Sequence, residues 1–445
     1  MKNNHEEAQM IRIIAFLSMI VLFASCGSSE KKSAGIPDYV PDDIKTYSSI
    51  PAFPGAEGFG GYASGGRGGK VLYVTSLNET GKGSLYSALG EKNSPGSIGP
   101  RYVLFKVSGK VAPSTKWDNN LLVREGNVTV AGQTSPGGII VRGLYSSSDK
   151  GRDGRSRDNV ILRHIRSRLP IDQDCLRLEQ MRFAIIDHCS FAWADDECVQ
   201  ISYCNNYTLQ NCILAETLGE HYDRGGVLIK FSSLEYPLGN ISFHHNMIHR
   251  IGGRVPQLDK YIFETEVQTN SSYAMNVEVS QNLIWDPKVL MLINETYTTP
   301  YGRFFAEPIN ANYIDNYMYT RPDFTEAMIS NVINPANSIY IEGNRMNLYP
   351  GYKDLQLMYG CNDFYKKYPN KTVWAGVSGI RNDFPVTSRL EAGDATIAYM
   401  IQKAGAFPRD AMDKRYTTSL QNRTIDTTHW QYKGADDGFI LDYSD

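Results

Sequence analysis

The sequence has no excess of charge of either sign, no closely spaced cysteine pair and no long hydrophobic run. Across 445 residues, 45 Lys and Arg residues nearly balance 48 Asp and Glu residues, which gives a net charge of -3. No overall field therefore attracts nucleic acid or an anionic membrane. None of the seven cysteines belongs to a CxxC pair, which argues against a zinc ribbon. The 39 glycines and 28 tyrosines favour a β-rich protein with many tight turns.

The one apolar run lies near the N-terminus. Residues 13–24 read IIAFLSMIVLFA, which is too short to span a bilayer comfortably and is typical of an export signal. Small residues then precede Cys26, a pattern that resembles the bacterial lipoprotein signal in which this cysteine becomes lipidated. We expect residues 1–25 to be removed, residues 26–48 to form a flexible tether and residues 49–445 to form the folded domain. The protein would then be exported and anchored by lipid to the bacterial outer membrane, on its periplasmic or cell-surface face, and otherwise secreted.

Six short apolar segments share one pattern. They read AIIDHCSF, YTLQNCIL, ISFHHNMI, VEVSQNLI, ANYIDNYM and IYIEGNRM. The residue before the Cys or Asn of each falls at 188, 211, 245, 281, 315 and 343, at intervals of 23, 34, 36, 34 and 28 residues. Apolar residues alternate around this repeat position, which predicts a strand with one buried face. A strand that recurs about every 23 residues with variable insertions is typical of a parallel β-helix, whose turns stack at ~4.8 Å.

One column of the repeat is polar or weakly polar in an otherwise apolar pattern. It consists of Cys189, Cys212, Asn246, Asn282, Asn316 and Asn344. Stacking inside the coil would satisfy the asparagine side chains against one another. Because an open coil exposes its core at both ends, we expect residues 83–89 and 394–415 to form short helical caps. The sequence therefore predicts an all-β protein that folds as a single-stranded parallel β-helix with short helical caps.

Polar side chains follow successive repeats at a similar distance. Five of them lie eight to ten residues after repeat positions 164, 188, 211 and 245: Asp174, Asp196, Glu197, His221 and Arg254. Residues at matching positions of adjacent parallel strands lie about one strand spacing apart. Carboxylates arranged in this way suit a hard cation such as Ca²⁺, and Asp172 and Gln200 could add oxygen atoms. The sequence therefore predicts a cation or substrate site at this corner of the coil.

Four motifs in order resemble the pectate lyases of polysaccharide lyase family 1, over most of residues 51–415. The segment AFPGAEGFGGYASGGRGGKVLYVTSLNETGKGSL (52–85) looks like the opening of many exported bacterial members. FAIIDH (183–188) is similar to the family's Trp-Ile-Asp-His strand, and GRVP (253–256) looks like its Arg-x-Pro motif. AGAFPRDAMDKR (404–415) resembles a common tail. The resemblance implies a right-handed parallel β-helix, a requirement for Ca²⁺ and cleavage of de-esterified homogalacturonan by β-elimination to unsaturated products.

The resemblance also assigns roles to residues. Asp174 and Asp196 match the family's calcium aspartates, and Arg254 matches its catalytic arginine. The chain departs from the family at Asp259, where a second arginine is common, and at Gln200, where a third aspartate is common. Glu197 is then expected as a further calcium ligand.

Two more residues, His221 and Arg224, are expected to contact substrate carboxylates, the arginine through a bidentate fork. The expected partner is an acidic polysaccharide, and we expect a monomer that binds no nucleic acid. It would contact the membrane only through its N-terminal lipid anchor.

Several patterns admit other interpretations. The glycines of GGRGGKV (65–71) superficially suggest a phosphate loop, but Val71 stands in place of the required Ser or Thr, so backbone turns explain them better. The lack of a metalloprotease motif favours a structural role over zinc binding for three histidines: His244, His245 and His249. Two interpretations fit a cluster of six arginines, which could form either a solvated edge or an extended groove that binds uronates: Arg152, Arg155, Arg157, Arg163, Arg166 and Arg168.

Two other functions stay open at this point. A β-helix hydrolase of the polygalacturonase kind would use paired aspartates, for which Asp195 and Asp196 are candidates. A surface lipoprotein without activity would bind pectin and leave its chain length unchanged.

Overall fold

The computed structural model describes most of residues 50–425. The described ranges are 50–90, 97–111, 121–146, 156–168, 174–194, 196–217, 225–233, 235–251, 253–263, 274–287, 291–293, 297–299, 302–306, 308–324, 328–330, 337–357 and 378–425. The predicted signal and tether, with Cys26, lie outside these ranges. No helix in the described ranges is long and apolar enough to cross a membrane.

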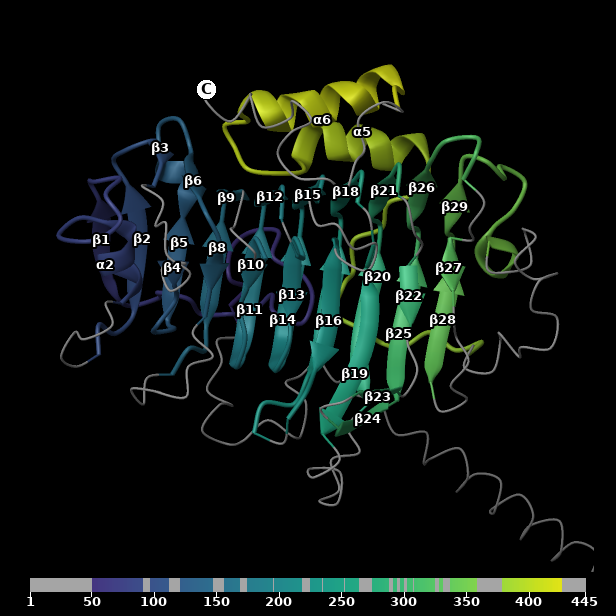
Figure 1. The fold of residues 1–445 in the computed structure, drawn as a ribbon, viewed down its shortest axis with the longest axis horizontal. Helices are drawn as coiled ribbons and strands as arrows, with labels where there is room; N and C mark the ends of the chain where they lie inside the picture. Colours follow the sequence, from purple (N-terminus) through teal and green to yellow (C-terminus); the bar gives the residue numbers. More distant parts are fainter. Residues whose placement is uncertain are drawn as a thin grey trace, which may run out of the picture. The chain divides into compact units, whose positions relative to one another are not determined.

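Successive turns of the chain add strands to three sheets, named A, B and C here (Figure 1). Sheet A contains β1 (Lys70–Val74), β2 (Arg101–Phe105), β5 (Val128–Ala131), β8 (Val160–Arg163), β11 (Met181–Asp187), β14 (Cys204–Gln210), β17 (Gly239–His244), β20 (Met275–Ser280), β25 (Ile309–Ile314) and β28 (Ser338–Glu342). Sheet B contains β3 (Gly109–Lys110), β6 (Ile139–Val141), β9 (Ile165–Arg168), β12 (Ser190–Ala192), β15 (Ile213–Ala215), β18 (Met247–His249), β21 (Leu283–Trp285), β26 (Tyr317–Tyr319) and β29 (Arg345–Met346). Sheet C contains β4 (Leu121–Leu122), β7 (Leu144–Tyr145), β10 (Leu176–Arg177), β13 (Val199–Ile201), β16 (Val227–Phe231), β19 (Gln257–Phe263), β22 (Met291–Ile293) and β27 (Ile329–Ser330), with β23 (Tyr297–Thr299) and β24 (Gly302–Ala306) joined antiparallel at its edge.

Each strand of the coil pairs in parallel with the strand one turn later, so the predicted parallel β-helix is confirmed. The sequence predicts one strand for each repeated segment, whereas the structure divides the segment into two. His188, Asn211 and His245, at the repeat positions, adopt left-handed backbone angles with φ of 52°, 55° and 56°. This conformation turns the chain sharply from sheet A into sheet B. Residues three positions later all enter the core: Phe191, Leu214, Ile248, Ile284, Met318 and Met346.

The predicted asparagine column forms a continuous hydrogen-bonded ladder inside the coil. The backbone N–H of Asn246 donates to Asn282 Oδ1 at 2.9 Å, and that of Asn282 donates to Asn316 Oδ1 at 3.1 Å. The amide group of Asn316 continues to Asn344 Oδ1 at 2.9 Å. The two cysteines that precede the asparagines in this column are buried free thiols. Stacking therefore satisfies these buried amides, as the repeat predicts.

Short helical elements lie at the two ends of the apolar core. α2 (Leu85–Leu89) packs its leucines into the core beside β1 and β4. The 3-10 turn η4 (Asp354–Leu357) places Leu357 in the core beside β28 and β29. A second 3-10 turn, η3 (Gly132–Thr134), follows β5. Of these three elements, the sequence predicts only the first helix.

The two C-terminal helices cover a side of the coil and not its end. α5 (Asp394–Lys403) and α6 (Ala411–Asn422) lie along the outer face of sheet B (Figure 1). Ile397, Met400 and Tyr416 pack there in one cluster with Trp193 and Trp285. The predicted break at Gly405 and Pro408 is present between these helices. The expected end cap at residues 394–415 is thus replaced by a side cover, because the outer face of sheet B is apolar and needs burial.

The glycine-rich opening segment lies flat against the outer face of sheet A. The Gly60 N–H donates to Thr208 Oγ1 at 2.9 Å, and the Gly66 N–H donates to Thr129 Oγ1 at 3.0 Å. A Cβ on Gly60 would stand 2.0 Å from the carbonyl oxygen of Ala184, which is closer than any side chain allows. These glycines therefore permit close approach of two backbones, in addition to the turns that the sequence suggests.

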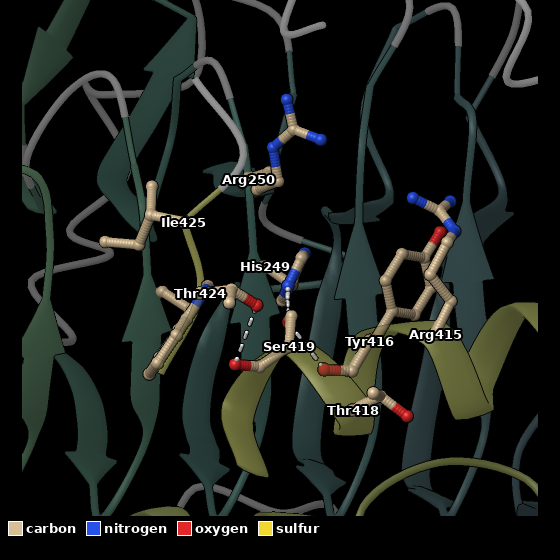
Figure 2. A pocket seen from close by; sticks show the side chains of 9 residues that line it. His249, Arg250, Arg415, Tyr416, Thr418, Ser419, Thr424 and Ile425 are labelled. Carbon is tan, nitrogen blue, oxygen red and sulfur yellow. Dashed lines mark hydrogen bonds between the residues drawn. The ribbon is translucent and has the colours of Figure 1, made fainter. Parts of the chain in front are cut away.

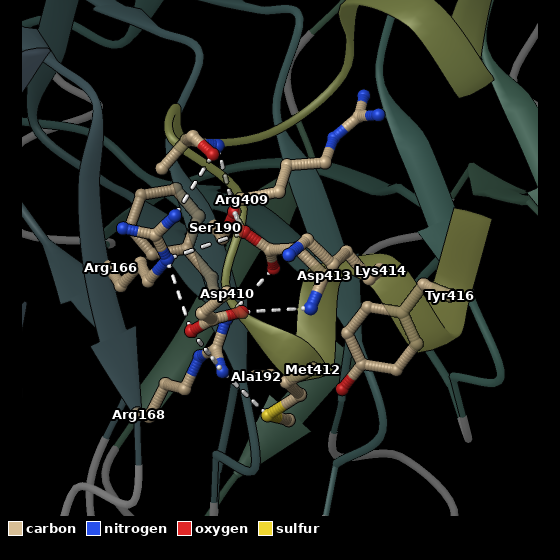
Figure 3. A network of polar contacts seen from close by, with 12 residues as sticks. Arg166, Arg168, Ser190, Ala192, Arg409, Asp410, Met412, Asp413, Lys414 and Tyr416 are labelled. Atoms are coloured by element: carbon tan, nitrogen blue, oxygen red, sulfur yellow. Dashed lines mark hydrogen bonds and ion pairs between the residues drawn. The ribbon is translucent and has the colours of Figure 1, made fainter. Parts of the chain in front are cut away.

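Two of the six clustered arginines form neither a solvated edge nor a groove. Arg166 and Arg168 are buried beneath α6 (Figure 3). Arg168 Nη2 lies 2.8 Å from Asp413 Oδ1, and Arg166 Nε lies 3.1 Å from Asp410 Oδ2. Ser190 Oγ donates to the second oxygen of Asp413 at 2.8 Å. These ion pairs fasten α6 to the coil, a role that requires residues more than 240 positions apart in sequence.

Glu278 on β20 makes the stability of the fold depend on pH. Its side chain is fully buried, accepts a hydrogen bond from Asn312 Nδ2 at 2.7 Å, and burial raises its pKa to about 7. Since this value lies above that of an unfolded glutamate, its stabilising contribution is complete below about pH 4.5 and is lost as the pH rises through 7. We expect Glu278→Gln to raise the free energy of unfolding by about 3 kcal/mol at pH 8 and to change it little at pH 4.5. Urea titrations at both pH values would measure this, with half-exposed Glu342→Gln as control. Equal effects of Glu278→Gln at the two pH values would contradict the prediction.

Candidate metal and substrate site

Four successive turns of the coil bring the site residues to the start of sheet C. Asp174 and Glu197 precede β10 and β13, whose strands pair Leu176 with Val199. The hydrogen bond from the Cys175 N–H to the Glu197 carbonyl continues this pairing toward the acidic residues. Matching positions of the next two turns hold Gly225, just before β16, and Gly253, just before β19 and next to Arg254. Residues far apart in sequence thus form one row at a corner of the coil.

Three carboxylates gather on this row. Asp174, Asp196 and Glu197 each offer an oxygen, and these oxygens lie within 4.8 Å of one another. The Glu197 N–H donates to Asp174 Oδ1 at 2.9 Å, which fixes the two turns relative to each other. Asp174 and Glu197 are buried, and Asp196 is half-buried. The structure therefore brings together the three residues that the sequence proposes as cation ligands.

Burial and like charge disfavour the ionised form of Asp174. The pKa of Asp174 is raised to about 7, mainly by burial and in addition by the negative charge of nearby Asp196. Arg177 and Arg254 act in the opposite direction through their positive charges. Since carboxylates crowded in this way repel one another, a cation placed among them would stabilise their charged form.

Arg254 reaches the cluster across a turn of the coil that has glycines at the facing positions. Its guanidinium Nη1 forms an ion pair with Glu197 Oε1, although two turns of the coil separate the residues. The intervening turn presents Gly225 and Gly226, and a Cβ on Gly226 would stand 2.1 Å from the carbonyl oxygen of Arg254. Arg254 itself has a positive φ of 56°, and its side chain is 17% exposed. The glycine pair therefore allows both the path of the arginine backbone and the reach of its side chain.

A second arginine lies on the other side of the cluster, and the sequence does not single it out. Arg177 on β10 points out of the core and pairs with Glu179, with Nε 2.9 Å from Oε1. Its Nη1 lies 3.9 Å from Asp174 Oδ2. Gln200 stands next to Arg177 on β13 and donates from Nε2 to Glu179 Oε1 at 3.2 Å. The alternation of Leu176 and Arg177 could have identified this outward position, but the two-residue strand is too short to stand out.

The donor set of the row fits a hard divalent cation. When ionised, the four carboxylates of Asp174, Glu179, Asp196 and Glu197 outnumber the two guanidinium groups of Arg177 and Arg254 by two charges. Ca²⁺ binds carboxylate oxygens at about 2.3–2.6 Å, so oxygens within 4.8 Å of one another can share one ion. One divalent cation would balance the charge. Asp174, Asp196 and Glu197 are the residues that could hold it.

A second cluster of possible metal ligands makes hydrogen bonds and ion pairs with the surrounding protein. His164, Asp187 and His188 bring their ligand atoms within 4.8 Å of one another. Asp187 accepts from Arg163 Nε and Gln210 Nε2 at 2.8 Å, and lies 2.8 Å from His188 Nδ1. His164 Nδ1 accepts from the backbone N–H of Phe407 at 3.0 Å, and burial lowers its pKa to about 3. This cluster is a hydrogen-bonded structural network that ties the C-terminal segment to the coil.

The other three histidines that the sequence raises are buried within the protein. His244 Nδ1 lies 2.8 Å from His245 Nδ1, and His249 Nε2 lies 2.8 Å from Ser419 Oγ. Burial lowers the pKa of His245 to about 4 and that of His249 to about 3, which favours the neutral form of both. None of them belongs to a group of possible metal ligands in the described ranges.

A pocket of about 380 Å³ lies between α6 and sheet B (Figure 2). Its wall includes Arg250, Trp285 and Arg415. Arg415 forms a bidentate pair with buried Glu216 at 2.9 and 2.7 Å, and Arg250 Nη1 lies 3.4 Å from the same carboxylate. These charges are paired within the protein, and the pocket contains none of the residues that the sequence proposes for the site.

Four residues that the sequence proposes for the site lie in segments outside the described ranges. They are His221, Arg224, Asp172 and Asp195. Asp259, which stands where the family has a second arginine, is buried on β19 and accepts from Gln257 Nε2 at 2.7 Å.

The chain is similar in sequence to fungal proteins described as probable pectate lyase C. A stretch of 180 residues is 38% identical to the protein of Aspergillus terreus and covers 39% of each chain. A longer alignment, 27% identical over 388 residues, covers 84% of this chain and 78% of the protein of Aspergillus flavus. In the more similar alignment the chain thus spans 39% of the length of its relative. The resemblance that the sequence motifs predict is confirmed.

Solved structures with a similar arrangement include two proteins of low sequence identity. The cedar pollen allergen jun a 1 is 13% identical, with a TM-score of 0.49 over 79% of this chain and 92% of that chain. A pectate lyase from Bacillus sp. N165 in complex with trigalacturonate is 13% identical, with a TM-score of 0.48 over 78% of this chain and 98% of that chain. No protein-family model matches the chain.

Proposed function

We propose, from the premise that the chain is a sequence relative of the probable pectate lyases, that it is a Ca²⁺-dependent pectate lyase. It would cleave de-esterified homogalacturonan by β-elimination and release unsaturated oligogalacturonides. The observation that carries this proposal is the contact of Arg254 with Glu197 at the edge of the three-carboxylate cluster. A base and an acidic cation site then stand side by side, as elimination from a uronate requires.

In this proposal, the carboxylates of the row bind the cation and the arginine acts as the base. β-Elimination removes the proton at C5 of a uronate, and the glycosidic oxygen at C4 leaves. A Ca²⁺ held by Asp174, Asp196 and Glu197 would neutralise the uronate carboxylate and acidify the C5–H bond. Arg254 would take the C5 proton.

An arginine is an unusual base, because its reference pKa lies above 12. Its side chain here is only 17% exposed, and a bound sugar ring would exclude water from it further. The paired Glu197 carboxylate favours the charged guanidinium, so a neutral Arg254 depends on a cation that engages Glu197 and on the desolvation that a bound sugar ring brings. Glu197 holds the group at the edge of the cluster and so fixes its position before substrate binds.

The absorbance of unsaturated products tests the proposal directly. The purified protein would be incubated with polygalacturonate, with Ca²⁺ added to one sample and a chelator to the other. We expect ultraviolet absorbance to rise only in the sample with Ca²⁺. New reducing ends without absorbance would indicate a hydrolase, and no change in chain length would indicate a binding protein. Either result would overturn the proposal.

We also propose that the protein is exported and attached to a membrane through lipid on Cys26. The support is the apolar run of residues 13–24 followed by small residues and this cysteine. Cys26→Ala should move the protein from the membrane fraction to the soluble fraction of expressing bacterial cells. Retention of the variant in the membrane fraction would contradict lipid attachment at this residue.

A further inference from the structure

The acidic cluster lies between two arginines that differ in solvent exposure. The Arg254 side chain is 17% exposed and is engaged with Glu197. The Arg177 side chain is 36% exposed and stands one turn of the coil before Glu197. Because a uronan carries a carboxylate on every unit, cations beyond the reacting unit are expected to contribute to its binding.

Arg177 is held in a fixed orientation by a buried carboxylate. Glu179 contacts its Nε at 2.9 Å, and the Glu179 side chain is only 3% exposed. Gln200 Nε2 donates to the same Glu179 oxygen, and Ser146 Oγ accepts from the Glu179 N–H at 2.6 Å. Burial of a carboxylate is costly unless it is paired and hydrogen-bonded, as Glu179 is. The arrangement therefore keeps the guanidinium plane in one place.

The outer edge of this guanidinium makes weaker contacts than its Nε. Within the described residues, Arg177 Nη1 approaches Asp174 Oδ2 only to 3.9 Å, which is beyond hydrogen-bonding distance. The Nη1 and Nη2 groups can form two parallel hydrogen bonds to a carboxylate. An orientation fixed at Nε, with an accessible outer edge, is a suitable arrangement for such a contact.

We propose that Arg177 binds the carboxylate of a second uronate unit, on the same chain as the unit that reacts beside Arg254. Glu179 is the positioning residue of this contact. The inference rests on the proposed function, because it takes a uronan as the substrate. It assigns to β10 a role in recognition that is separate from the cation ligands and from the base.

The split between KM and kcat tests the proposal. With Ca²⁺ saturating, we expect Arg177→Gln to raise the KM for polygalacturonate about tenfold and to change kcat less than twofold, because one charge-assisted carboxylate contact is lost. Arg177→Lys should recover part of the loss, since it keeps the charge but not the fork. Glu179→Gln should raise KM by a smaller factor. A KM for Arg177→Gln within twofold of the unmodified protein would overturn the proposal.

Arg423 provides a matched control. Its side chain is also 36% exposed and paired with a carboxylate, but it lies at the end of α6, where it contacts Asp394 at 2.6 Å. Arg423→Gln should leave KM and kcat unchanged. An equal rise of KM in Arg423→Gln would mean that loss of any surface charge has this effect, and the proposal would fall.

Binding measurements separate this inference from the proposed function. Calorimetry with tetragalacturonate requires no turnover, and we expect Arg177→Gln to weaken its binding about tenfold. If the unmodified protein yields no unsaturated product but shows this difference, the lyase proposal fails and the role of Arg177 stands. If tetragalacturonate does not bind, or binds both proteins equally, the role of Arg177 is overturned.

Discussion

Arg254→Lys should lower kcat on polygalacturonate by about 1000-fold, with a KM within a few-fold of that of the unmodified protein. Removal of a positioned general base typically costs 10²–10⁴-fold. The Arg254 guanidinium spans a turn occupied by glycines to reach Glu197, and a lysine presents a single nitrogen at a different point. Initial rates of ultraviolet absorbance at saturating Ca²⁺ would measure the effect.

The control for this variant is Arg389→Lys. Arg389 is also paired with carboxylates, at 2.9 Å from Asp315 Oδ2, and its side chain is 38% exposed. It lies far along the coil from the cluster, beside the last strands of sheet A, and should tolerate lysine without loss of kcat. Full turnover by Arg254→Lys would exclude Arg254 as the base and would leave it only a role in substrate binding.

Asn282→Ala should lower the free energy of unfolding by about 4 kcal/mol, because it leaves several buried polar groups without partners. Asn282 Oδ1 accepts from both the backbone N–H and the side-chain amide of Asn246, at 2.9 and 3.2 Å. Its own amide donates to the Phe243 carbonyl and to Asn316 Oδ1, both at 3.0 Å. These groups are shielded from bulk solvent, since Asn246, Asn282 and Asn316 are at most 1% exposed. Urea unfolding at neutral pH would measure the change.

A second asparagine ladder supplies the matched comparison. Asn276 Nδ2 donates to Asn240 Oδ1 at 2.8 Å, and Asn310 Nδ2 donates to Asn276 Oδ1 at 3.1 Å. Asn276 and Asn310 are half-buried, so water can replace a lost partner. Asn276→Ala should therefore cost only about 1 kcal/mol. Similar losses of unfolding free energy for Asn276→Ala and Asn282→Ala would show that burial does not determine how much each ladder stabilises the fold.

This second ladder could also have been found in the sequence. Asn240, Asn276 and Asn310 each lie five residues before a repeat position, at 245, 281 and 315. The column is less visible than the first because it falls where the apolar alternation begins, and the corresponding residue of the first segment is Phe183. The column lies one residue before the apolar segments that define the repeat, so the alternation that reveals the first column does not include it.

The acidic site, in contrast, could be predicted from the repeat. Asp174, Asp196 and Glu197 follow the repeat at nearly constant distances, so the regular stacking of the coil places them together. Arg177 and Glu179 carry no such signal in the sequence. Their proposed role in binding depends on the 2.9 Å hydrogen bond between their side chains and on the partial solvent exposure of the Arg177 side chain.

The sequence by itself determined the parallel coil, the asparagine ladder and the corner that gathers the carboxylates. These follow from the period of the repeat, because a strand that stacks on its own next turn converts spacing along the chain into position in space. Only the tertiary structure decided that residues 394–422 cover a side of the coil and that Arg166 and Arg168 are buried ion-pair partners. It also decided that Arg254 reaches Glu197 over a turn of glycines. The contacts of the C-terminal helices join residues with no common period, and the reach of Arg254 depends on the glycines between the two turns, so both depend on side-chain shape and burial, which spacing alone does not encode.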